Sequence, residues 1–217
     1  MNMLFYLKNR LRKYIFPSHE LSELWINFLP HKKLRILDIG CGSGLFLKLL
    51  AGICHRDSLL YGVEVDERLY GTFTTQEGMV INIGSPESIE NREFDVCVFN
   101  DVLHHIDNKK DFLLIYLEKL TKTKTCWLLI KDMSPDNPLC LFWNRLHDKV
   151  VTGRNIHEIA PHKIETMLEY SGETACGRWE VLVRGKRRIF LYDHYYLLFT
   201  RSPSIVPHVL TGRRVSA

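Results

Sequence analysis

Short apolar runs alternate with segments of helical periodicity along most of the chain. Strands covered on both faces read as nearly continuous apolar runs, and parallel strands need a crossover helix between them. We therefore predict an α/β fold built on a mostly parallel sheet. Its predicted strands occupy residues 34–39, 59–65, 79–83, 94–100 and 126–132.

The segments between and after these strands favour helices. Apolar residues recur in them at helical spacing, and the last segment starts near Pro161 and is followed by Gly172, residues typical of helix boundaries. The predicted helices occupy residues 43–53, a short stretch within 67–73, 111–120 and 161–172.

The C-terminal part of the chain has a different pattern. Two apolar runs, 178–185 and 193–201, predict an antiparallel pair of strands at the edge of the sheet. Residues 134–160 mix aromatic and polar side chains with weak periodicity, and a long insertion after a strand often lies over a binding crevice. We interpret 134–160 as a site-forming insert within one domain spanning 34–200, followed by an irregular tail, 201–217.

Residues 1–33 are predicted to form a helical lid before this domain. Leu4, Leu7, Leu11 and Ile15 recur at helical spacing with basic residues between them. Two interpretations remain open: a helix docked on its own domain, or a peripheral contact with a membrane surface or an acidic carrier protein. The chain has no secretory signal pattern and no run of about 20 apolar residues. We therefore expect a cytoplasmic protein.

Composition agrees with one globular domain and limits the partners. The chain has 217 residues, of which 46% are hydrophobic and 25% charged, and its net charge of +4 is too small to indicate nucleic-acid binding by itself. The six cysteines are scattered without a C-x-x-C pair, which argues against a structural zinc site and for buried thiols in a reducing compartment.

Three glycines lie between the first predicted strand and its helix, and their spacing excludes two common motifs. In the dinucleotide pattern G-x-G-x-x-G, a third glycine would fall on Leu45 counting from Gly40, or on Leu47 counting from Gly42. The phosphate-binding loop needs Lys after its last glycine, but Leu45 follows Gly44. The three glycines therefore either let a ligand other than a dinucleotide or a nucleotide phosphate approach the backbone, or only allow a tight turn.

The actual pattern, Asp38-x-Gly-x-Gly-x-Gly, resembles the first motif of class I S-adenosylmethionine-dependent methyltransferases of the small-molecule branch. Glu64 ends the second strand about 20 residues later, where an acidic residue can accept both ribose hydroxyls. The stretch FDVCVFNDVLHHI, 94–106, is similar to the fourth strand and following loop of that family. The resemblance implies a Rossmann-like three-layer sandwich with a seven-stranded, mostly parallel sheet and an antiparallel edge strand.

The resemblance also implies S-adenosylmethionine as the cofactor and a role for each matching residue. Asp38 would place the methionine amine, the glycine backbone would line the nucleoside, and Glu64 would hold the ribose. Ser85 stands where the family often has an aspartate near the adenine, and Asn100 would face the methionine half. The implied cofactor-binding residues are Asp38, Gly40, Gly42, Gly44, Glu64, Ser85 and Asn100.

Methyl transfer from a sulfonium is a direct displacement, so a base is needed only when the acceptor must lose a proton. Histidine suits that task near neutral pH, and His104, His105 and His147 are the catalytic candidates. A structural interpretation remains for each of them, as a helix cap, a packed ring or a surface residue. Asp148 and His157 also lie in or near this region.

Three apolar residues of the acceptor-site insert, Phe142, Trp143 and Ile156, either line an acceptor pocket or cover the sheet as core. No catechol-type metal constellation is present, so the sequence predicts no metal and no magnesium requirement.

The predicted function is S-adenosylmethionine-dependent methyl transfer to a small or carrier-attached metabolite, at oxygen, with carbon and nitrogen left open. An RNA or protein methyltransferase is an alternative, supported only by the basic residues 186–188, which we expect in a solvated hairpin loop. A non-catalytic scaffold that keeps the cofactor site is another. DNA is not expected, because NDVLHH after the fourth strand lacks the motif of DNA and amide methylation.

Overall fold

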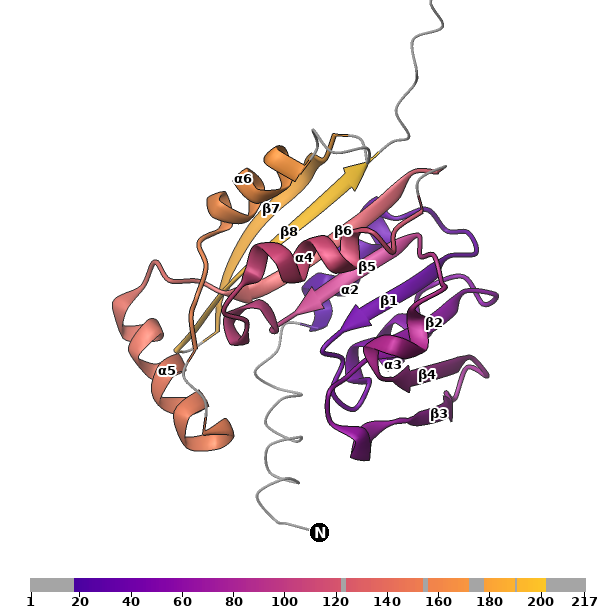
Figure 1. The fold of residues 1–217 in the computed structure, drawn as a ribbon, viewed down its shortest axis with the longest axis horizontal. Helices are drawn as coiled ribbons and strands as arrows, with labels where there is room; N and C mark the ends of the chain where they lie inside the picture. Colours follow the sequence, from indigo (N-terminus) through magenta and orange to yellow (C-terminus); the bar gives the residue numbers. More distant parts are fainter. Residues whose placement is uncertain (1–17, 122–123, 154–155, 172–177, 190, 202–217) are drawn as a thin grey trace, which may run out of the picture.

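The computed structural model describes residues 18–121, 124–153, 156–171, 178–189 and 191–201. Its centre is one eight-stranded sheet in the order β3-β4-β2-β1-β5-β6-β8-β7 (Figure 1). The strands are β1 (Arg35–Ile39), β2 (Leu59–Val63), β3 (Gly71–Thr74), β4 (Val80–Gly84), β5 (Val96–Asn100), β6 (Cys126–Met133), β7 (Glu180–Ile189) and β8 (Tyr192–Arg201). The helices are α2 (Ser18–Phe28), α3 (Leu45–Ala51), α4 (Lys109–Leu117), α5 (Pro138–Thr152) and α6 (Pro161–Ser171).

Strand pairing confirms the mostly parallel sheet. β1 lies in the centre between β2 and β5, and the pairs β2–β4 and β5–β6 are also parallel. β8 pairs antiparallel with β6, and β7 with β8, which confirms the predicted antiparallel edge. Because the carboxyl ends of parallel neighbours lie at the same edge of a sheet, the segments after β1, β2, β4, β5 and β6 meet there.

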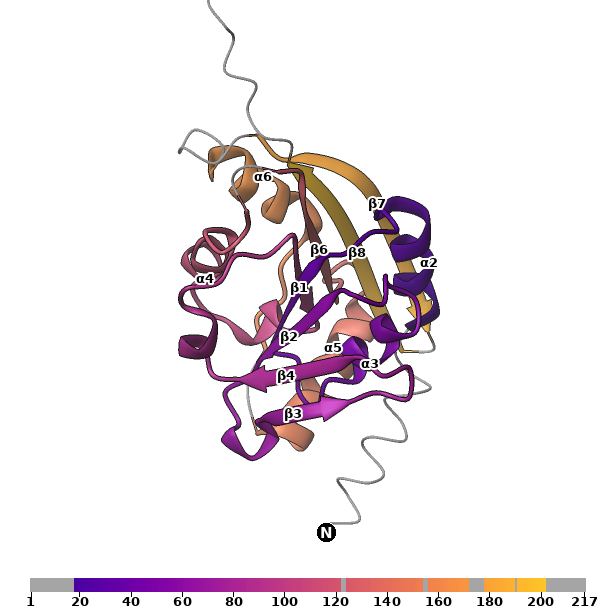
Figure 2. The same cartoon turned by 90° about the vertical axis from the view of Figure 1, so that its right-hand side faces the viewer.

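Helices cover both faces of the sheet and complete three layers (Figure 2). On one face, α2 and α3 pack Trp25 and Leu47 against the strands, in a core that includes Trp127. On the other face, α4 and α6 contribute Tyr116 and Leu168 to a second core. The role of residues 1–33 as a lid stays a prediction, and residues 1–17 and 202–217 lie outside the described part of the chain.

The sheet has eight strands where the sequence predicted seven, because β3 adds an antiparallel strand next to β4. The short helix expected within 67–73 is only a single 3₁₀ turn, Glu67–Leu69, in which the Asp66 side chain accepts a hydrogen bond from the Arg68 amide. Gly71 then adopts φ 156°, and the β-branched threonines that follow favour an extended strand.

The insert 134–160 contains a regular helix, α5, that its weak periodicity did not predict. The Asn137 side chain accepts hydrogen bonds from the Leu139 and Cys140 amides at its start, and Gly153 ends it in the left-handed conformation. Only one narrow face of α5 is buried, through Cys140, Asn144 and Asp148. A polar pair on the buried face explains why the pattern looked irregular.

The basic residues expected in a hairpin loop lie instead within strand β7. The Lys186 ammonium lies 2.9 Å from the Asp136 carboxylate and 3.2 Å from that of Asp193. In the described part of the chain, no helix combines the length and apolar character needed to cross a bilayer. The cytoplasmic location stays a prediction.

Candidate functional site

The loop after β1 has a backbone that only glycine adopts easily. Gly40, Gly42 and Gly44 have φ values of 66°, 55° and 71°. A Cβ atom at Gly40 would also overlap the Val102 side chain, and one at Gly44 would lie 2.9 Å from the Ile83 Cδ1 atom. At Gly40 and Gly44 both the backbone conformation and the neighbouring side chains therefore exclude a side chain, and at Gly42 the conformation alone disfavours one.

Asp38 lies on β1 just before this loop, with its side chain buried. Its Oδ1 atom has no hydrogen-bond partner among the described residues. Burial, followed by the charge of Glu64, raises the pKa of the Asp38 carboxyl well above its ordinary value. A buried, uncompensated carboxyl at the end of a strand is suited to a ligand that brings a cationic donor.

Glu64 follows β2, and its carboxylate faces the glycine loop. Its Oε2 atom accepts a hydrogen bond from the Gly42 amide at 2.8 Å, and its Oε1 atom accepts one from the Val65 amide at 2.8 Å. Asp66, the nearby alternative, is directed elsewhere and pairs with Arg68 at 2.6 Å. The second strand thus presents one carboxylate to the loop.

The two remaining residues of the predicted cofactor site flank this pair of strands. Ser85 follows β4 and precedes a 3₁₀ turn, Pro86–Ile89. Its hydroxyl bonds to Glu87 and lowers the pKa of that carboxyl. Asn100 ends β5, and its Oδ1 atom lies 3.3 Å from the Lys131 ammonium. The strand order therefore brings the predicted cofactor residues to one edge of the sheet.

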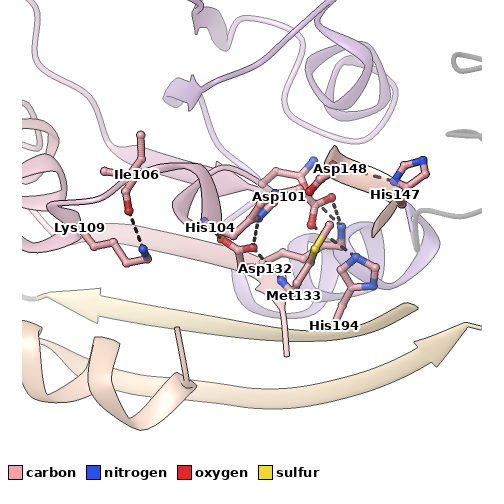
Figure 3. A network of polar contacts seen from close by, with 11 residues as sticks. Asp101, His104, Ile106, Lys109, Asp132, Met133, His147, Asp148 and His194 are labelled. Atoms are coloured by element: carbon pink, nitrogen blue, oxygen red, sulfur yellow. Dashed lines mark hydrogen bonds and ion pairs between the residues drawn. The ribbon is translucent and has the colours of Figure 1, made fainter. Parts of the chain in front are cut away.

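A second group of polar side chains lies beside them, at the carboxyl ends of β5 and β6, and Asp148 of α5 is part of it (Figure 3). We call it the buried polar cluster; it comprises Asp101, His104, Lys131, Asp132, Asp148 and His194, all of them buried or nearly so. Such groups are rarely buried unless they are paired.

His104 is at the centre of the cluster and is 1% exposed. Its Nδ1 atom makes a short contact with Asp132, whose other oxygen accepts the His104 backbone amide at 3.1 Å. Its Nε2 atom lies 3.5 Å from Asp148 Oδ2. Burial favours the neutral ring, but the carboxylates of Asp132, Asp101 and Asp148 outweigh burial and raise the pKa of His104 to about 9.

The other half of the cluster contains a buried cation. The Lys131 ammonium pairs with Asp101 Oδ2 at 2.5 Å, and Asp101 Oδ1 lies 3.6 Å from His194 Nε2. Burial and then the charge of Lys131 lower the pKa of His194 to about 4, so this ring is neutral near neutral pH. Asp101 has a φ of 56°, unusual for a residue other than glycine.

The three predicted catalytic histidines separate into two groups. The rings of His104 and His105 have centroids 4.0 Å apart, and both reach Asp148. His147 lies toward the outside: its side chain is 39% exposed, its Nδ1 atom is 3.9 Å from Asp148, and its ring packs edge-on to Tyr192. The structure thus places His104 inside the buried polar cluster and His105 directly beside it, whereas His147 lies at its outer side.

The sequence did not single out His194 or Asn144, although both are buried. The signal for His194 is its place next to Asp193, as two polar residues that directly precede the apolar run 195–199 of β8. Of the proposed acceptor wall, Phe142 is 67% exposed and Trp143 is partly exposed, so neither covers the sheet as core, whereas Ile156 is buried.

A family model described as a methyltransferase domain matches residues 6–172. Because this match covers more than half of the chain, the protein belongs to this family of methyltransferases. The class I S-adenosylmethionine-dependent methyltransferase predicted from the motifs is thereby confirmed, as are its Rossmann-like fold and, at the level of the family, its cofactor.

Solved structures with the same fold include magnesium protoporphyrin IX methyltransferase from Synechocystis PCC 6803 with bound SAH. It has a TM-score of 0.65 and 17% identity, over 88% of this chain and 87% of that one. The plantazolicin methyltransferase BpumL, in complex with a pentazolic desmethylPZN analog and SAH, has a TM-score of 0.64 and 13% identity, over 91% of this chain and 90% of that one. Likeness at this level of identity shows the fold.

Curated relatives match a smaller part of the chain. Ubiquinone biosynthesis O-methyltransferase of Rickettsia felis is 27% identical over 85 residues, which are 38% of this chain and 35% of the relative. The protein of the same name from Rickettsia bellii is 22% identical over 114 residues, 47% of this chain and 48% of the relative. The chain thus spans half or less of the length of these relatives.

Proposed function

We propose that this methyltransferase transfers the methyl group of S-adenosylmethionine to an oxygen atom of a small or carrier-attached metabolite. The observation that carries the proposal is the buried polar cluster, which lies at the same sheet edge as the glycine loop. A hydroxyl acceptor becomes a strong nucleophile when it loses its proton, and buried imidazole and carboxylate groups can take or hold that proton. The curated relatives are named O-methyltransferases, which supports oxygen as the methylated atom.

In this proposal the cofactor lies across the ends of β1 and β2. When bound, it supplies a methyl group on a positively charged sulphur. Asp38 Oδ1, which has no partner among the described residues, accepts from the ligand's ammonium group. The Gly40–Gly44 loop allows the nucleoside to approach the backbone, and Glu64 exchanges its loop hydrogen bond for the ribose hydroxyls. Ser85 and Asn100 complete the two ends of the site.

The acceptor in turn lies against β5, β6 and α5. We propose that its reacting group lies next to His104 and His105, whose rings adjoin each other, with His147 at the rim. The exposed side chains of Phe142 and Trp143 on α5 offer an apolar surface to the rest of the acceptor or to its carrier. We do not extend the proposal to RNA, because Lys186 is already engaged by two carboxylates.

The test uses the full chain, methyl-labelled S-adenosylmethionine, and three aromatic acceptors that differ in the reacting atom: catechol, aniline and thiophenol. Label is measured in each product by mass spectrometry. We expect label in the methyl ether of catechol and at least tenfold less in the other two. Transfer to nitrogen or sulphur with none to oxygen would contradict the proposal, as would S-adenosylhomocysteine binding without transfer to any acceptor hydroxyl in a fractionated cell extract.

A further inference from the structure

We propose that His104, His105 and Asp148 form a binding site for a divalent transition-metal ion. Each of these residues offers one ligand atom, and the three atoms lie within 4.8 Å of one another. Atoms that bind one ion through bonds of about 2.1 Å lie at most about 4.2 Å apart, so only a small closure of the longest edge is needed. The two elements that carry them, the 3₁₀ turn Leu103–His105 and α5, meet over the ends of β5 and β6.

The His104 ring is held as metal-binding rings usually are. Its Nδ1 atom contacts the buried carboxylate of Asp132, which also accepts the amides of His104 and Met133. This arrangement fixes the ring and leaves Nε2 directed at Asp148, 3.5 Å away. A carboxylate on the far nitrogen of a ligating histidine orients the ring and strengthens it as a ligand.

The charges and the surroundings agree with a bound cation. Asp132 and Asp148 are both buried on either side of the His104 ring. A divalent ion bound at Nε2 in place of a proton would keep a positive charge between these two carboxylates. Asn144, one turn before Asp148 on the same face of α5, is fully buried, and neither polar atom of its side chain has a hydrogen-bond partner in the described part of the chain. A site occupied by an ion and its water would give such a side chain a partner.

The donor set indicates the class of ion. Two imidazoles and one carboxylate suit Zn²⁺, Co²⁺ or Fe²⁺, whereas Mg²⁺ prefers oxygen ligands alone. The proposal departs from the sequence prediction that the protein holds no metal and agrees only with its second part, that magnesium is not required. Three protein ligands leave positions open, and an ion held there would act as a Lewis acid toward an acceptor hydroxyl. This role rests on the proposed function, but binding of the ion does not.

The test titrates Co²⁺ into the full chain after treatment with a chelator and records the visible absorption spectrum without cofactor or acceptor. We expect saturable bands of protein-bound Co²⁺, displaced by Zn²⁺. Asp148→Asn and His105→Asn should each weaken binding at least tenfold. The control is His162→Asn, since His162 is an exposed histidine of α6 that lies outside the triad. Co²⁺ binding by this variant should equal that of wild type.

Calorimetry with S-adenosylhomocysteine checks that each variant is folded, because no residue of the triad belongs to the proposed cofactor site. The inference is overturned if wild type gives no bound-Co²⁺ bands, if both substitutions at the triad leave Co²⁺ affinity unchanged, or if His162→Asn weakens that affinity as much as they do. None of these results depends on methyl transfer, so they leave the test of the proposed function untouched.

Discussion

His194 gives the sharpest prediction about stability and pH. Its ring is buried on β8, and the groups facing it are Lys131 and Asp132 of β6, Asp101 after β5, and His104. Burial and the Lys131 cation lower its pKa from 6.5 to about 4. Because the folded pKa is below the unfolded one, the unfolded chain binds this proton first as pH falls. Stability present above pH 6.5 is therefore lost as pH falls toward 4.

The size of the loss follows from the shift. Lowering the pKa of His194 from 6.5 to about 4 changes the free energy of unfolding by about 1.4 kcal/mol per pKa unit. Over the whole pH range this amounts to about 3 kcal/mol. Between about pH 7.5 and about pH 5 the linkage relation gives a loss of about 2 kcal/mol. The glutamine variant His194→Gln keeps a polar side chain and cannot titrate, so it should lack this part of the pH dependence.

The assay is urea unfolding at several pH values, in a chelator, followed by circular dichroism. The quantity compared is the change in free energy of unfolding between about pH 7.5 and about pH 5 for wild type and for His194→Gln. Wild type should lose about 2 kcal/mol more than the variant. His162→Gln, at an exposed position on α6, should match wild type. Equal pH dependence in wild type and His194→Gln would refute the reasoning.

Three further predictions concern the cofactor loop. Asp38→Asn should leave the free energy of unfolding equal or higher at neutral pH, because it removes a buried charge, while calorimetry shows weaker S-adenosylhomocysteine binding. Glu64→Ala should weaken that binding by about tenfold or more, because one or two hydrogen bonds to a carboxylate are lost. Glu67 is exposed, so Glu67→Ala should leave the binding unchanged. Gly40→Ala should lower the free energy of unfolding by about 2 kcal/mol or more in urea, because the new Cβ atom strains a left-handed backbone and overlaps the Val102 side chain. Gly78→Ala, with φ 79° and open space, should cost only about 1 kcal/mol; equal losses would contradict the overlap.

The fold followed from the sequence wherever burial on both faces produced a clear pattern. The strands of the parallel core could be predicted because their residues are continuously apolar, as in Val96–Asn100. The exposed edge strand β3 could not, because a strand with four exposed residues leaves no apolar signal. Helix α5 was missed for a related reason, since its buried face carries Asn144 and Asp148 in place of apolar residues.

The candidate site was predictable only where backbone geometry or a strand end limits the residue type. Glycines at positive φ mark the loop, and Asp38 and Glu64 follow from their positions at the ends of β1 and β2. The buried polar cluster depends instead on contacts between distant segments, such as that of His104 with Asp148. A single sequence does not show which distant residues are in contact. The histidines could therefore be proposed as candidates, but buried His104 could not be distinguished from exposed His147.

The order of strands explains why the two halves of the site belong together. β1 carries Asp38 and lies directly beside β5, which leads to His104, and β5 lies beside β6, which carries Asp132. A ligand held by the carboxyls after β1 and β2 therefore has the buried polar cluster as its neighbour on one side. At the ends of β1 and β2, a cationic group of the ligand would offset the negative charge of Asp38 and Glu64. At the ends of β5 and β6, Lys131 and the His104 ring already offset the carboxylates of the protein. We therefore expect this difference in charge between adjacent strand ends to favour one orientation of the bound cofactor.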